Sequence, residues 1–141
     1  MKGCVTSVLV VDDFAQWRRV VSAALREKLG LRTIAEAGDG LEAVDKAEEF
    51  QPDLVVLDIG LPTLNGIEAA RRIRSVSPNS KVVFLTQNCS SDVAEAALDT
   101  GANGYVVKSA FGRELISAVE AALEGRRFLS DQLPALHMEL A

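Results

Sequence analysis

Residues 54–58 read LVVLD, four apolar residues followed directly by an acid. A short apolar run without two-residue alternation is typical of a strand that is buried on both faces. Similar runs occupy residues 8–11, 82–85 and 105–107. We therefore expect four central strands. A weaker fifth strand is expected at residues 32–37, where Thr33 and Ile34 precede Glu36 as in an edge strand with one wet face.

Segments with helical periodicity lie between these runs. In residues 14–29 the apolar side chains fall at intervals of three and four, which makes one continuous stripe. Comparable segments cover residues 40–50, 66–76, 91–100 and 111–124. Strands that alternate with helices predict a parallel sheet with helices on both faces, because right-handed crossovers carry each helix over the sheet. The expected fold class is α/β, a single doubly wound (βα)5 domain.

Size and composition narrow the class of protein. The chain has 141 residues, of which 48% are hydrophobic and 25% charged, as expected for one globular domain. Its formal net charge of -5 argues against direct nucleic-acid binding by this chain. We found no apolar run of about 20 residues and no secretory signal, so a cytoplasmic protein without a membrane segment is expected. Cys4 and Cys89 are expected to be free thiols, and the single histidine, His137, argues against histidine-ligated metal.

Polar residues follow the expected strands at the point where each strand ends. Asp12 and Asp13 come after the first strand, Asp58 after the third, Thr86 after the fourth and Lys108 after the fifth. The carboxyl ends of parallel strands meet at one edge of the sheet, where ligands of such folds bind. We therefore expect these five side chains to lie close together.

The residue types in this cluster indicate phosphoryl transfer. Neighbouring carboxylates repel one another unless they are protonated or bind a hard cation, and Mg²⁺ prefers oxygen ligands. Asp58 is the candidate nucleophile, and Lys108 is placed to neutralise charge on the equatorial oxygens of a phosphoryl group. The Thr86 hydroxyl is placed to donate a hydrogen bond to that group once it has arrived.

The motifs at these strand ends resemble those of the response-regulator receiver family. They are the Asp12-Asp13 pair, the segment DIGLP at residues 58–62 with Gly66 after it, Thr86 and Lys108, and the resemblance covers residues 7–130. It implies a CheY-like, flavodoxin-like fold with strand order 2-1-3-4-5. It also implies a signalling switch rather than a metabolic enzyme, with self-catalysed phosphotransfer and autodephosphorylation.

The resemblance further implies a role for each site residue. A sensor histidine kinase would phosphorylate Asp58 to a 4-aspartylphosphate. Asp13 and Asp58 would bind Mg²⁺ directly, Asp12 would help through water, and the Gly60 carbonyl would complete the metal site. Lys108 would hold the phosphoryl oxygen. Thr86 and Tyr105 would shift together as the switch that remodels the partner-binding surface.

Residues 101–108 and 125–130 resemble in particular the NarL/FixJ-type branch of two-component systems. Regulators of that branch usually continue into a DNA-binding domain and control transcription, and phosphorylation favours a homodimer. We expect the receiver at residues 1–130 and a tail or the start of a linker at residues 131–141. No DNA-binding domain fits within this chain.

Each motif also has a simpler interpretation. Asp12 or Asp13 alone would be expected to cap a helix, and a lone Tyr105 is more often a packing residue.

Other functions of the whole chain are also considered. A phosphatase with an aspartate nucleophile would need a second acid at position 60, where Gly60 stands. A pseudo-receiver that binds only partners and a flavin-binding protein of the same fold are further alternatives. The family often has a proline after the lysine, in a cis peptide, whereas Ser109 stands here, so a cis bond at Lys108–Ser109 is in doubt.

Overall fold

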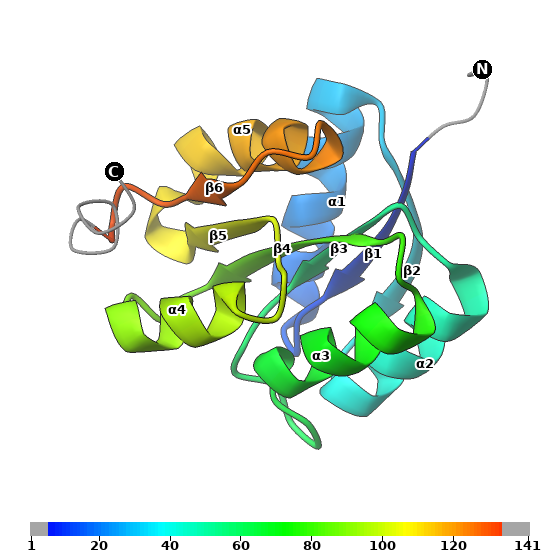
Figure 1. Ribbon diagram of the computed structural model, residues 1–141. Coiled ribbons are helices and arrows are strands. Elements are labelled where there is room, and N and C mark those ends of the chain that lie inside the picture. Colours follow the sequence, from blue (N-terminus) through cyan, green and yellow to red (C-terminus); the bar gives the residue numbers. More distant parts are fainter. Residues whose placement is uncertain (1–5, 134–141) are drawn as a thin grey trace.

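The computed structural model describes residues 6–133, which form one sheet with helices on both faces (Figure 1). The strands are β1 (Ser7–Val11), β2 (Arg32–Ala37), β3 (Leu54–Leu57), β4 (Lys81–Thr86), β5 (Gly104–Val107) and β6 (Phe128–Leu129). The helices are α1 (Ala15–Leu29), α2 (Gly40–Phe50), α3 (Gly66–Val76), α4 (Ser91–Leu98), the single 3-10 turn η1 (Lys108–Ala110) and α5 (Phe111–Leu123). These bounds confirm the five expected strand–helix units.

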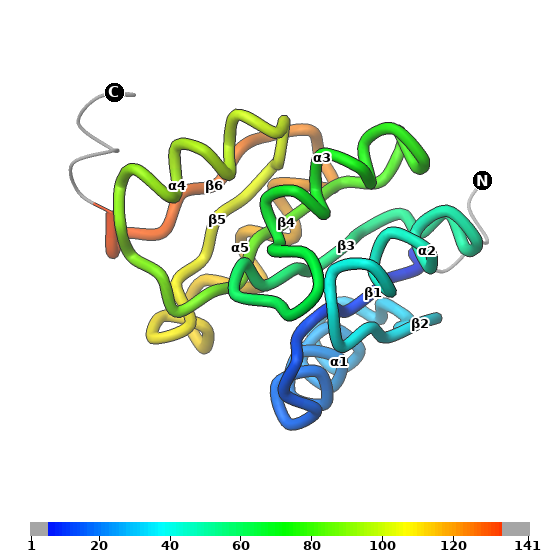
Figure 2. The backbone as a smooth tube through the Cα atoms, turned by 90° about the horizontal axis from the view of Figure 1, so that it is seen from below, coloured from blue at the N-terminus to red at the C-terminus, as the bar shows by residue number. Residues whose placement is uncertain are grey.

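All neighbouring strands are parallel, in the order β2-β1-β3-β4-β5-β6, which confirms the expected order 2-1-3-4-5 and extends it by one strand. Helices α1 and α5 cover one face, and α2, α3 and α4 cover the other (Figures 1 and 2). A separate apolar core therefore lies on each face of the sheet. No helix within residues 6–133 is long and apolar enough to span a membrane.

Strand β6 was not expected from the sequence. Two backbone bonds attach it to the open side of β5: the Phe128 amide donates to the Asn103 carbonyl at 2.9 Å, and the Ser130 amide donates to the Tyr105 carbonyl at 2.8 Å. Leu133, just beyond it, is only 1% exposed and belongs to the same apolar core as Tyr105. A two-residue strand has no periodicity to reveal it. The rest of the expected tail, residues 134–141 with His137, lies outside the described residues, as does Cys4.

The start of α2 is fixed by side-chain caps. Asp39, the N-cap residue, accepts a hydrogen bond from the Glu42 amide at 2.9 Å and another from the Thr63 hydroxyl at 3.0 Å. Glu42 in turn accepts from the Gly38 amide at 2.8 Å. The two bonds that Asp39 accepts favour its ionised form, first of all the one from the Glu42 amide, and they hold the pKa of Asp39 below its ordinary value. The cap thus joins α2 to the loop that follows β3.

Asp39→Ala should lower the free energy of unfolding by about 1 kcal/mol at neutral pH, because it removes the cap of α2. Since the pKa of Asp39 is depressed in the folded state, its contribution is present above the ordinary value of 3.8 and is lost as the pH falls through the lower, folded value. Urea unfolding curves at a series of pH values measure both effects. Asp39→Asn is the matched control, since asparagine caps helices as well as aspartate. An equal loss in both variants at neutral pH would contradict the capping account.

Candidate functional site

The acids that follow β1 and β3 meet at the carboxyl ends of these adjacent strands. The register pairs Val11 with Leu57, and the Asp58 amide donates to the Val11 carbonyl at 3.1 Å, so Asp12 and Asp58 leave the sheet side by side. One carboxylate oxygen each from Asp12, Asp13 and Asp58 lie within 4.8 Å of one another. Asp12 and Asp58 are buried, whereas Asp13 is exposed. The three acids therefore form one cluster that opens to solvent on the side of Asp13.

Lys108 brings a positive charge into this cluster from the end of β5. Its Nζ lies 2.7 Å from Asp12 Oδ2 and 3.0 Å from Asp58 Oδ2. Burial acts to lower the pKa of Lys108, but the hydrogen bonds to the two carboxylates outweigh it and raise that pKa. Burial also raises the pKa of Asp12, despite its bond to Lys108. One ammonium, shared by two buried carboxylates, offsets only part of the negative charge.

Each buried carboxylate has its other oxygen fixed by a nearby amide. Asp12 Oδ1 accepts from the Phe14 amide at 2.9 Å, and Asp58 Oδ1 accepts from the Ile59 amide at 2.7 Å. Helix α1 begins only after Phe14, whose side chain makes no cap hydrogen bond. The simple helix-cap interpretation is therefore wrong for Asp12 and Asp13. No peptide bond in residues 6–133 is cis, and this includes the bond between Lys108 and Ser109.

The loop after β3 is held tightly beneath Asp58. The Gly66 amide donates to the Ile59 carbonyl at 2.7 Å, and so does the Leu61 amide at 2.8 Å. A Cβ atom on Gly66 would lie 2.0 Å from the Asp58 carbonyl oxygen and 2.7 Å from the Ile59 Cα. Only glycine fits at the start of α3, because the backbone of the Asp58 loop passes directly against it.

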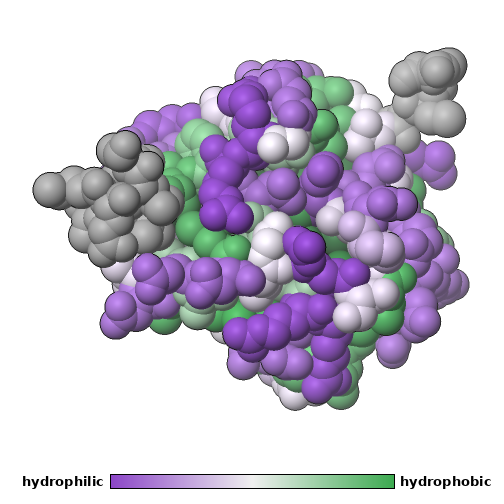
Figure 3. Space-filling model, in the orientation of Figure 1, coloured by the Kyte–Doolittle hydropathy of each residue, from purple (hydrophilic) through white to green (hydrophobic). Residues whose placement is uncertain are grey.

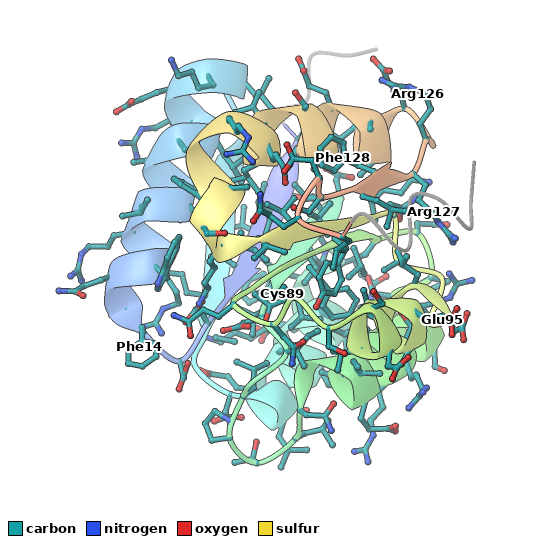
Figure 4. All side chains as sticks on the ribbon, turned by 90° about the vertical axis from the view of Figure 1, so that its left-hand side faces the viewer. Phe14, Cys89, Glu95, Arg126, Arg127 and Phe128 are labelled. Carbon is teal, nitrogen blue, oxygen red and sulfur yellow. The ribbon has the colours of Figure 1, made fainter. Side chains whose placement is uncertain are left out.

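A polar pocket of about 380 Å³ lies over these groups. Its lining combines the acids, the lysine and the loops after β1, β3 and β4: Asp13, Phe14, Asp58, Ile59, Gly60, Thr86, Gln87, Asn88 and Lys108. Figure 4 shows Phe14 at the start of α1 and Cys89 in the loop between β4 and α4. The surface seen in Figure 3 is mainly hydrophilic, with small apolar patches between the polar residues.

Asn88 links the two residues that we expected to act as a switch. Its amide donates to Thr86 Oγ1 at 3.4 Å, and its carbonyl accepts from the Tyr105 hydroxyl at 2.7 Å. Tyr105 is completely buried and packs against Phe84 at a ring-centroid distance of 6.2 Å. Burial raises the pKa of the Tyr105 hydroxyl. The sequence does not reveal these two contacts, because both use the backbone of Asn88.

The donors in the cluster suit a hard divalent cation. All are oxygens, and the carboxylates of Asp12, Asp13 and Asp58 carry three negative charges against the single charge of Lys108. Such an excess favours the binding of a cation through oxygen. The cluster can therefore bind a metal ion, with Gly60 in the lining beside it.

Comparison with known proteins agrees with this geometry. Residues 8–120 match the family described as "Response regulator receiver domain". The response regulator GacA of Pseudomonas viridiflava is 34% identical over 126 residues, which are 89% of this chain and 59% of GacA. The transcriptional regulatory protein PdtaR of Mycobacterium tuberculosis is 40% identical over 136 residues, which are 95% of this chain and 62% of PdtaR. The chain thus spans less than two thirds of the length of these curated relatives.

A solved structure shows the same fold over nearly the whole chain. A two-component response regulator of the LuxR family from Aurantimonas sp. SI85-9A1 superposes with a TM-score of 0.89 and 35% identity. The match covers 97% of this chain and 99% of that chain.

Gly66→Ala should destabilise the protein by about 1–3 kcal/mol, because the added methyl group forces the backbone at Asp58 and Ile59 to move. Urea unfolding measures the loss of stability, and amide NMR shifts at residues 58–61 report the displacement. The matched control is Gly112→Ala in α5, where an added Cβ meets no atom within 4 Å and stability should be unchanged or slightly raised. Equal stabilities for the two variants would show that the contact at Gly66 does not constrain the loop.

Proposed function

The chain belongs to the response-regulator receiver family, and we propose that it accepts a phosphoryl group on Asp58 and thereby changes the surface that it presents to a partner. Members of this family are signalling switches. The observation that carries the proposal is the position of Asp58. Asp58 is buried at the carboxyl edge of the sheet and lines the polar pocket. Its carboxylate lies 3.0 Å from the Lys108 ammonium.

The proposed reaction transfers a phosphoryl group to a carboxylate oxygen of Asp58. As the new O–P bond forms, the bond from phosphorus to the donor breaks, and the leaving group keeps that electron pair. The donor is a phosphohistidine of a sensor kinase or a small acyl phosphate. Lys108 neutralises charge on the phosphoryl oxygens, because its ammonium already lies against Asp58. Attack of water on phosphorus later releases phosphate and restores Asp58.

We propose that Asp13, Asp58 and the Gly60 carbonyl bind Mg²⁺ directly in this reaction, and that Asp12 contributes through water. When bound, the ion supplies positive charge where the carboxylates and phosphoryl oxygens come together. Asp13 is the exposed member of the set and so lies nearest to solvent. The cluster contains only oxygen donors, which supports Mg²⁺ over metals that prefer nitrogen or sulfur.

Thr86 and Tyr105 are the proposed switch residues. Thr86 Oγ1 accepts one hydrogen bond from the Asn88 amide, and its hydroxyl hydrogen has no acceptor among the described residues. That hydrogen is available to donate to a phosphoryl oxygen. A shift of Thr86 would move Asn88 and, through the Asn88 carbonyl, the Tyr105 hydroxyl. This pair of contacts supports a coupled rearrangement of the loop before α4.

The proposed partner is a sensor histidine kinase, with a second copy of this chain as a further partner in the phosphorylated state. We propose that phosphoryl transfer from the kinase takes place in the cytoplasm. PdtaR is named a transcriptional regulatory protein, and we propose control of transcription as the output here as well. With a net charge of -5, this chain offers little electrostatic attraction for DNA, so contact with DNA is assigned to another domain or protein. The receiver is assigned to residues 1–130.

Incubation with acetyl phosphate and Mg²⁺ should add one phosphoryl group to the wild-type protein, as measured by intact mass after rapid quenching. Asp58→Asn should show no adduct, and removal of Mg²⁺ should abolish the adduct in the wild type. Asp53→Asn is the matched control, since Asp53 precedes the same strand at its opposite end and should leave the adduct in place. An unmodified wild type would favour the pseudo-receiver alternative.

Lys108→Ala should retain Mg²⁺ binding but lose the structural change that phosphorylation causes, because the acids remain and the cation that contacts the phosphoryl group is gone. Titration with Mg²⁺ and NMR spectra with and without beryllium trifluoride, a mimic of the phosphoryl group, measure the two properties separately. Lys46→Ala, which removes a lysine from α2, is the control. A full spectral response in Lys108→Ala would rule out the role assigned to Lys108.

A further inference from the structure

Trp17 contacts a residue of the site, although Trp17 itself lies in a helix and does not follow a strand. It is in the first turn of α1, and its ring faces the Lys108 ammonium, with Nζ 4.7 Å from the ring centroid. The same Nζ donates to Asp58 at 3.0 Å and lies 2.7 Å from Asp12. The cation is thus bounded by two carboxylates and by the face of one aromatic ring.

The ring itself is held in place by its neighbours. Phe111, the first residue of α5, meets it edge to face, with ring centroids 5.5 Å apart and an interplanar angle of 82°. Phe111 follows Lys108 by the single turn η1. The ring that contacts Trp17 and the lysine therefore belong to the same short segment. Trp17 also lines both a pocket that includes Lys108 and an apolar pocket of about 260 Å³ formed with Gln16, Val20 and Phe111. Trp17 therefore separates the pocket beside Lys108 from the apolar pocket between α1 and α5.

We propose that Trp17 is a positioning residue that fixes the Lys108 ammonium against Asp58. A cation is attracted to the face of an indole ring, and the attraction grows when water is excluded, as it is for the buried Lys108. A lysine side chain has many rotamers, and contact with the ring favours those that keep Nζ beside the two carboxylates. The consequence for phosphoryl transfer rests on the function proposed above. The contact between Trp17 and Lys108 does not.

If Trp17 acts through Lys108, its replacement should matter only while the lysine is present. Trp17→Leu should slow phosphorylation by acetyl phosphate about three- to tenfold, the range expected for loss of a partly desolvated cation–π contact. Trp17→Phe should restore part of the rate, since phenylalanine keeps a weaker aromatic face. Val20→Ala, which alters the same apolar pocket without touching Lys108, should leave the rate unchanged.

The decisive comparison is the double variant. In the Lys108→Ala background, Trp17→Leu should cause no further loss of rate, because the group that it positions is absent. Residual phosphorylation in that background is measured by intact mass over long incubation. If the two substitutions reduce the rate by factors that multiply, Trp17 acts independently of Lys108 and the proposal is overturned. Urea unfolding of each variant separates a loss of folded protein from a loss of rate.

A second measurement does not depend on phosphorylation. Trp17 is the single tryptophan of the chain, so tryptophan fluorescence reports on its surroundings alone. Lys108→Met should shift the emission or change its intensity in the unphosphorylated protein, whereas Lys46→Met, on the opposite face of the sheet, should not. Unchanged fluorescence in Lys108→Met would overturn the proposal. A fluorescence response in a protein that takes up no phosphoryl group would support the contact and count against the proposed function only.

Discussion

A single ammonium shared by two buried carboxylates is the interaction on which the site depends. Lys108 Nζ lies 2.7 Å from Asp12 Oδ2 and 3.0 Å from Asp58 Oδ2, and all three residues are buried. Leaving buried carboxylates without a cation costs about 3–5 kcal/mol, so the lysine makes their burial tolerable. Because one positive charge faces three acids, the cluster still favours a further cation. The same imbalance that would destabilise an ordinary core allows this pocket to bind a metal ion.

The sheet supplies the constraint that brings these charges together. The chain runs from β1 outward to β2 and then returns to β3 on the other side of β1, so the acids after β1 and β3 flank the point where strand order reverses. β5 lies two strands beyond β3, and Lys108 reaches back from its end with a four-carbon side chain. Gly66 lets α3 begin directly against the Asp58 backbone. The two apolar cores hold these elements in a fixed register, and this fixes the positions of the polar groups at the strand ends.

Much of this arrangement can be predicted from the sequence, because apolar runs mark buried strands and the polar residue after each run marks its end. The bounds of β2, α2 and α3 agree with the periodicity, and the five strand-end residues do converge. β6 could not be predicted, since two residues give no pattern and its stability comes from the edge of β5. The Asn88 bridge uses backbone atoms, and the contact of Trp17 with Lys108 joins residues 91 positions apart, so neither leaves a local signal. From the sequence alone, Trp17 is predicted only to be part of the apolar stripe of a helix.

We propose that Asp58 itself accepts the phosphoryl group, and chemical trapping can identify the acceptor residue. Borohydride reduces an acyl phosphate to an alcohol, which converts a phosphorylated aspartate to homoserine and leaves free carboxylates unchanged. After reaction with acetyl phosphate and Mg²⁺, then borohydride, peptide mass spectrometry should find homoserine at position 58, with Asp12, Asp13 and Asp53 intact. Homoserine at another acid, or none in a protein that binds Mg²⁺, would contradict the assignment of Asp58 as the acceptor.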